Sequence, residues 1–207
     1  MFNRYFNADG DGDFLYANIA MKNIHFALIS LNHILYKADF SVGIYHDEHT
    51  YYFFHIQSLL TACGNISNVF YNYGGLGGKG ATQRSQRLRN TFNVTKTEYP
   101  LIFQKEVRNT NEHFDERYDA FNGRVGDYNL LDENTTTDMR KVIINQPHLR
   151  TYDKINGVYH TYNRNLEPIT YNLYQLQGEL QRMLSTIEAN PVFCSQWVDT
   201  MSNEQVV

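Results

Sequence analysis

The chain has 207 residues, which suits a single domain and is long enough to bury a hydrophobic core. Its net charge of −4 excludes a molecule that attracts nucleic acid with its whole surface, so any RNA contact needs a local basic patch. The two cysteines lack the spacing of a metal site, and neither an apolar leader nor a membrane-length apolar run is visible. We therefore expect a cytoplasmic protein without metal, cofactor or membrane span.

Two long helices are predicted first, after a polar, Gly/Asp-rich and flexible N-terminus at residues 1–12. Asp13 can cap a helix over residues 13–39, and a second helix is expected over residues 47–71. Apolar residues recur at helical spacing in the first of them: Leu15, Ile19, Ile24, Leu28, Leu31 and Leu35. The short connection between the two helices predicts an antiparallel helical hairpin.

A glycine-rich run at residues 74–80 then predicts a mobile loop. The stretch after it is basic and weakly helical, with Lys79, Arg84, Arg87 and Arg89. One interpretation is a patch that contacts nucleic-acid phosphates, and the alternative is an ordinary solvated surface.

A third long helix is predicted over residues 98–120, with Pro100 in its first turn and Gly123 ending it. Its apolar row steps by four and three residues, with Arg117 at the one missing position: Phe103, Val107, Thr110, Phe114 and Phe121.

The pattern becomes extended over about residues 124–165. Residues 141–144 predict a short strand, and residues 149–152 and 158–162 flank an Asn156-Gly157 turn that indicates a β-hairpin. A last helix is expected from Pro168 to just before Pro191, followed by a tail at 191–207. The predicted fold is thus mainly α: one antiparallel helical bundle over residues 13–190, with a small β-hairpin element before the C-terminal helix.

Chemistry-bearing residues gather on the third helix, opposite its apolar row. Arg108, Asn109, Glu112 and His113 lie on this polar face if the helix is continuous. RNA cleavage at a 2′-hydroxyl needs a base and an acid, and a histidine can serve as either near neutral pH. An arginine fork can stabilise the phosphorane-like charge without a metal. Arg108 and His113 diverge by roughly 140° on one helix, so a two-fold dimer is needed to bring such pairs together.

The Arg108-Asn109-x-x-x-His113 pattern resembles the motif of the HEPN superfamily, in which an Arg and a polar residue precede a His. This resemblance covers roughly residues 13–123. It implies a dimeric, metal-independent endoribonuclease of a bacterial defence or toxin–antitoxin system, with Arg108, His113 and Asn109 as catalytic residues and Glu112 in support. RNA, a second copy of the chain and a protein antitoxin or other partner would be its partners.

Two alternatives remain open. Some members of that superfamily are non-catalytic, so the chain could be a helical binding or assembly module of the same fold. In the third interpretation Arg108 and Glu112 form a structural i,i+4 ion pair and His113 merely packs.

Overall fold

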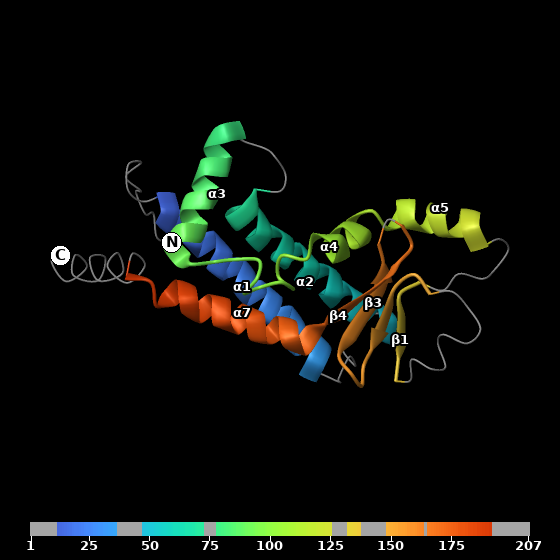
Figure 1. Ribbon diagram of the computed structural model, residues 1–207. Coiled ribbons are helices and arrows are strands. Elements are labelled where there is room, and N and C mark those ends of the chain that lie inside the picture. The colour runs from blue at the N-terminus through green and yellow to red at the C-terminus, as the bar shows by residue number, and fades with distance from the viewer. Residues whose placement is uncertain are drawn as a thin grey trace.

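The fold is mainly helical with a small mixed sheet at one end (Figure 1). The computed structural model describes residues 12–36, 47–72, 78–125, 132–137, 148–163 and 165–191, and of residues 121–125 it describes the backbone alone. The predicted flexible N-terminus apart from Gly12, the strand expected at 141–144 and most of the C-terminal tail lie outside the described residues.

Helices α1 (Gly12–Tyr36) and α2 (Glu48–Tyr71) run antiparallel, as the sequence predicts. Two interhelical hydrogen bonds define this direction: Asn65 donates to Asn23 at 2.9 Å, and His33 bonds the Tyr51 hydroxyl at 2.8 Å. Asp47 caps α2, since its carboxylate accepts from the Thr50 amide at 2.7 Å. Asp13 does not cap α1, because it lies inside the helix and its carboxylate pairs with Arg87.

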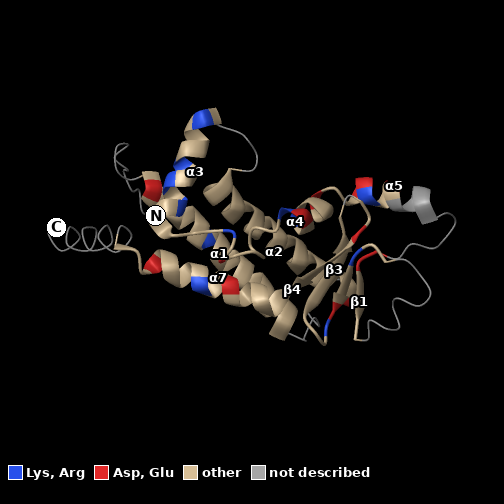
Figure 2. Ribbon diagram, in the orientation of Figure 1, with Lys and Arg blue, Asp and Glu red and all other residues tan. Residues whose placement is uncertain are grey.

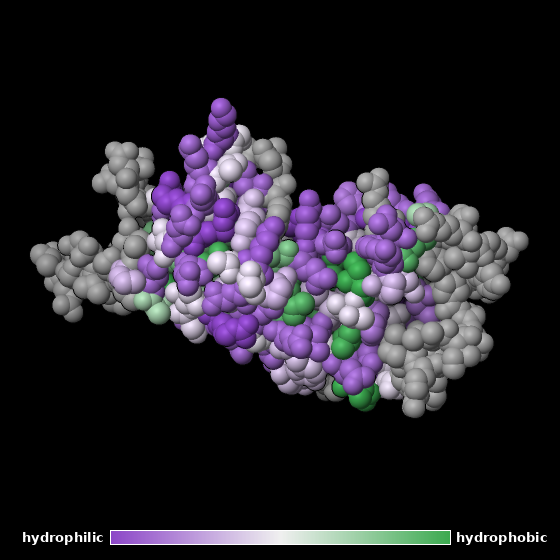
Figure 3. Space-filling view, in the orientation of Figure 1, coloured by the Kyte–Doolittle hydropathy of each residue, from purple (hydrophilic) through white to green (hydrophobic). Residues whose placement is uncertain are grey.

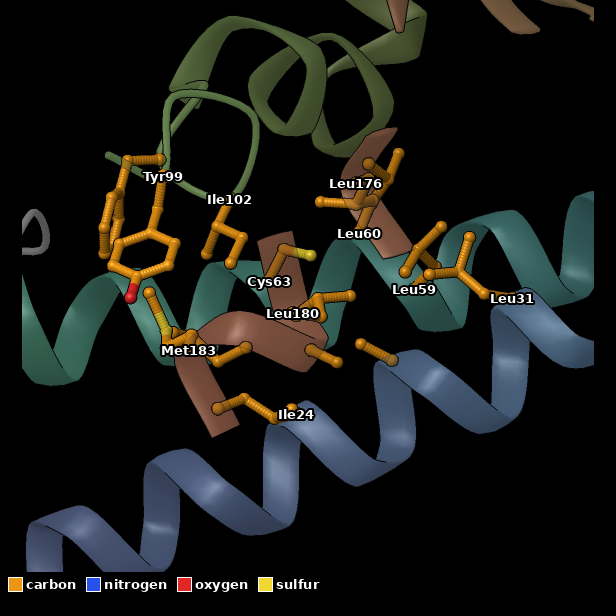
Figure 4. Close-up of a cluster of buried hydrophobic side chains, with 14 of the residues drawn as sticks. Ile24, Leu31, Leu59, Leu60, Cys63, Tyr99, Ile102, Leu176, Leu180 and Met183 are labelled. Carbon is orange, nitrogen blue, oxygen red and sulfur yellow. The ribbon is translucent and has the colours of Figure 1, made fainter. Parts of the chain in front are cut away.

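The hydrophobic core lies where α7 (Leu173–Glu188) packs beside α1 and α2 (Figures 1 and 4). Its buried side chains come from these three helices and from the turns at 96–103, and Figure 4 labels ten of them: Ile24, Leu31, Leu59, Leu60, Cys63, Tyr99, Ile102, Leu176, Leu180 and Met183. By length and composition α1 could cross a membrane, alone among the described helices, yet 44% of its most apolar window is buried in this core.

The last three residues of the glycine-rich segment are helical. Gly78 and Gly80 belong to helix α3 (Gly78–Phe92), which carries the basic stretch and packs against α2. Residues 73–77 lie outside the described part of the chain.

The prediction of one long helix over residues 98–120 is wrong. Residues 96–103 form turns, and two separate helices follow, α4 (Lys105–Glu112) and α5 (Phe114–Val125). The turns persist because Glu179 of α7 accepts from the backbone amides of Leu101 and Ile102 at 3.0 and 3.1 Å, which fixes this segment from outside. Gly123 lies within α5 and does not end it.

The described sheet has four strands in the order β1 (Asn134–Thr136), β2 (Thr151–Asp153), β3 (Val158–Tyr162) and β4 (Pro168–Asn172). β1 pairs parallel to β2, and the other pairs are antiparallel. The β2–β3 pair confirms the predicted hairpin. The helix expected from Pro168 begins only at Leu173, because residues 168–172 alternate between exposed and buried as a strand and Asn172 caps α7.

Candidate active site at the junction of α4 and α5

His113 stands at the corner between α4 and α5. Its amide still donates to the Asn109 carbonyl at 3.0 Å, but its backbone angles of φ −120° and ψ 43° leave the helical region, so α4 ends there. The Thr110 hydroxyl, 2.8 Å from the Tyr162 carbonyl, ties α4 to the end of β3. The corner is therefore built by a helix break and one strand contact.

Arg108 does not lie on a free polar face, as the sequence had predicted. Its guanidinium donates to the Gly64 carbonyl of α2 at 3.3 Å, and its side chain is only 13% exposed. A Cβ atom at Gly64 would lie 2.6 Å from the Arg108 Cδ, so this glycine makes room for the arginine. Glu112 lies 3.6 Å from the Arg108 Nε, which matches the structural ion pair of the third interpretation.

His113 and Asn109 share a polar cavity of about 460 Å³ with a different arginine, Arg117 of α5. The segment between β3 and β4 adds Asn163 and Asn165 to the lining. The Asn163 side chain shapes this turn, because its oxygen accepts from the amides of Asn165 and Glu167, both at 2.9 Å. The cavity thus combines a histidine, an arginine and side-chain amides from three elements.

Arg117 is the residue that sequence reasoning missed. Its side chain is only 9% exposed, and its Nε has no hydrogen-bond partner among the described residues. Nη1 lies 3.9 Å from Glu116, too far for a hydrogen bond. The signal was present, since Arg117 occupies the one position where the predicted apolar row lacks an apolar residue. A buried arginine whose Nε has no hydrogen-bond partner is a candidate to bind an anion.

The His113 side chain is half exposed, and its Nδ1 lies 3.4 Å from a Glu116 carboxylate oxygen. Glu116 therefore sits between His113 and Arg117 and can hold the ring in one orientation. Glu106 also lines the cavity, so the site contains negative as well as positive groups.

Arg150 holds the sheet against this corner. Its guanidinium bonds Asp132 at 2.9 and 2.5 Å, and it donates to Asn111 of α4 at 3.3 Å. The same group lies over the ring of Phe114, the first residue of α5, at 4.9 Å from the centroid. The site's geometry therefore depends on a buried cation from a different part of the chain.

The arginines of the predicted basic patch bond other residues of the same chain. Three arginines of α3 contact α1 and α2: Arg84 donates to the Tyr16 hydroxyl at 2.9 Å, and Arg87 forms a bidentate pair with Asp13. Arg89 donates to the Phe70 carbonyl. Lys79 belongs to the exposed first turn of α3. Figure 2 places this basic helix at the opposite end of the molecule from α5.

Comparison of the chain with protein-family models, curated proteins and solved structures gives no match. Among the described residues, no three His, Cys, Asp or Glu side chains are grouped to hold a metal ion.

Proposed function

We propose that the chain is a metal-independent endoribonuclease that acts as a dimer, with the α4–α5 cavity as its active site. The observation that carries this proposal is that Asn109, His113 and Arg117 line one polar cavity. Arg117 takes the role that the sequence assigned to Arg108, since Arg108 contacts α2 instead.

The reaction fits these groups. The RNA 2′-oxygen attacks the adjacent phosphorus, the bond from phosphorus to the 5′-oxygen breaks, and a 2′,3′-cyclic phosphate and a 5′-hydroxyl form. A base takes the 2′-hydroxyl proton and an acid gives one to the 5′-oxygen. His113 is exposed enough to exchange a proton with substrate, and Glu116 lies beside its ring. Arg117 stabilises the charge that develops on the non-bridging oxygens.

One His113 cannot be both base and acid in the same step. The second proton-transfer group would be Glu106 or Glu116, which line the same cavity, so the chemistry does not need His113 of a second copy. Asn109 lines the same cavity and can hold a phosphate oxygen through its amide. A bacterial defence or toxin–antitoxin role, and a protein antitoxin as partner, belong to this proposal too.

Cleavage of a fluorescent RNA in the presence of a chelator tests the proposal. We expect His113→Asn and Arg117→Met to lose at least about 100-fold in rate, the usual magnitude for an acid–base group or a charge-stabilising donor. Arg117→Lys should recover part of the loss, since it keeps the charge but not the fork. His25→Asn, on an exposed face of α1, is the matched control and should retain full activity.

Retention of wild-type activity by both His113→Asn and Arg117→Lys would reject the proposed site. Because Arg117 is buried, circular dichroism and urea unfolding of each variant must accompany the assay. Activity lost only in Arg108→Lys would restore the arginine expected from the sequence.

A second candidate is the non-catalytic binding or assembly module. It is favoured by the contacts of Arg108 with Gly64 and of the α3 arginines with α1 and α2, which occupy the groups expected to bind RNA. Absence of cleavage by the folded wild-type chain, across varied RNA substrates, would select this candidate.

A further inference from the structure

Helix α1 carries two apolar rows, and only one of them faces the core. The buried row contributes to the helical core: Ala17, Ala20, Ile24, Ala27, Leu31 and Ile34. The second row is exposed, and it includes Leu15 and Ile19, two of the apolar residues whose spacing predicted this helix. It comprises Leu15 at 39%, Ile19 at 37%, Phe26 at 56%, Ile29 at 56% and Tyr36 at 58% exposure.

The exposed row has the spacing of a helix–helix seam. Its positions 15, 19, 22, 26, 29, 33 and 36 alternate steps of four and three residues, with Lys22 and His33 at the two remaining places. Sustained four–three spacing of apolar residues is how a helix presents knobs to a partner helix. A solvated helix face would carry charged residues there instead.

The adjoining face of α2 continues this surface. Phe54 is 53% exposed, and a groove of about 620 Å³ runs between the two helices, with Phe26, Ile29, Phe54 and Thr61 among its lining residues. Glu48, at the first turn, is the sole Asp, Glu, Lys or Arg of α2, and α1 has only Asp13 and Lys22. By contrast, the face shown in Figure 3 is largely hydrophilic with scattered hydrophobic residues.

The chemistry of this face suits a second copy of the same face. A two-fold interface places the groups near its axis beside their own copies, so charged groups there would repel, whereas amides and hydroxyls can donate and accept at once. The polar groups of the groove are of that kind, including Asn23, Gln57, Thr61 and Asn65. An antiparallel two-fold axis near Phe26 would place Lys22 beside Ile29 of the other copy and away from its own counterpart.

The available area is also of the right size. A helix of 25 residues is about 37 Å long, and two helices at ordinary spacing present a face roughly 18 Å wide. The face is therefore about 700 Å² per copy, close to the roughly 800 Å² per partner of a standard stable interface.

We propose that the α1–α2 face is the interface of a homodimer, in which two helical hairpins pack as four helices. This places the interface away from the polar face of residues 98–120, where the motif alone had suggested it. The proposal does not rest on ribonuclease activity, because it concerns other residues and is tested without RNA.

Sedimentation equilibrium and light scattering at about 20 µM, a concentration at which a micromolar or tighter dimer is mostly assembled, test it directly. The wild-type chain should have twice its 24.2 kDa mass. Phe26→Glu and Phe54→Glu should each give monomers that remain folded by circular dichroism, since both positions are already exposed. Ile155→Glu, at a position 66% exposed on the hairpin turn, is the matched control and should leave the dimer intact.

Mixing the Phe26→Glu and Phe26→Lys variants sharpens the test. If the two-fold axis lies near Phe26, opposite charges meet and the mixture should recover dimers that neither variant forms alone. A monomeric wild-type chain, or a dimer that survives both glutamate substitutions, would overturn the proposal. A chain that is monomeric in solution but binds vesicles of phosphatidylcholine and phosphatidylglycerol would overturn it in favour of a lipid surface.

Discussion

Glu179 is a buried carboxylate whose function is to hold the turns that precede α4. It is 5% exposed and accepts from the amides of Leu101 and Ile102. Burial raises the pKa of Glu179 above its usual value, against the opposing effect of the two amide donors. The protonated form is therefore favoured by folding. Its stabilisation is complete below the carboxyl pKa of the unfolded chain and declines as pH rises through the higher pKa of the folded state.

Glu179→Gln should remove this titration while keeping an oxygen for the two amides. We expect the free energy of unfolding of the variant, relative to wild type, to increase between pH 4 and pH 7 in urea titrations. Glu179→Ala should instead lose about 2–3 kcal/mol at both pH values, because two buried amides lose their acceptor and a cavity opens. A relative stability of Glu179→Gln that stays constant or falls with pH would contradict the raised pKa.

Arg108 and Arg117 show what the sequence can and cannot predict for single residues. The predicted apolar row of residues 98–120 correctly places Val107 and Thr110 in the interior, since both are buried. Arg117 occupies the one position of that row where an apolar residue is missing. Assigning Arg108 to a solvent face required a continuous helix, and the break at His113 invalidates that geometry. Nothing local in the sequence indicates that Gly64, in a distant helix, leaves space for the Arg108 side chain.

At the scale of elements, prediction succeeded where the determinants are local. The β2–β3 hairpin follows from its Asn-Gly turn, and α2 follows from its capping Asp47. Prediction failed for residues 98–103, which form turns that Glu179 of α7 holds through the amides of Leu101 and Ile102. The strand β4 had a local signal, since Ile169 and Tyr171 alternate with exposed residues, but Pro168 also suits a helix start.

Gly157 couples the hairpin turn to two helices. Its φ of +60° is left-handed, and a Cβ there would lie 2.5 Å from a Tyr174 ring carbon and 3.1 Å from Leu35. Gly157→Ala should therefore destabilise the fold by about 3 kcal/mol, from backbone strain plus the steric clash. Urea unfolding measures this loss.

Gly80→Ala is the matched control, because no atom lies within 4 Å of a Cβ built at Gly80, on α3. It should stabilise the protein by about 0.5–1 kcal/mol through helix propensity alone. Equal effects of the two substitutions would show that packing around Gly157 is unimportant.

At the scale of the molecule, the sheet and the helices depend on aromatic and cationic contacts between distant segments. Tyr152 of β2 donates to the Ile34 carbonyl of α1 at 3.2 Å, and Tyr171 of β4 donates to the Leu101 carbonyl at 2.8 Å. On the side of the candidate site, Arg150 contacts both Asp132, just before β1, and the ring of Phe114 in α5. These two tyrosine side chains therefore help to attach the sheet to the helical part of the molecule.

Arg150 and Asp132 form the most buried ion pair in the described part of the chain, with side chains 9% and 25% exposed. Arg150→Met should reduce the free energy of unfolding by about 3 kcal/mol, because Asp132 is left without its counter-ion and the sheet loses its contact with Asn111. Asp132→Asn should lose less, since Glu133 also pairs with Arg150 at 3.0 Å.

A double-mutant cycle on this pair should give a coupling of about 1–2 kcal/mol. The exposed pair of Arg87 and Asp13 is the matched control, with a similar bidentate geometry and an arginine side chain 59% exposed. Its coupling should not exceed about 1 kcal/mol, because water screens it. If the two cycles agree, burial does not strengthen the Arg150 pair, and the corner at His113 must be held by the Thr110 contact and the apolar packing of α4 instead.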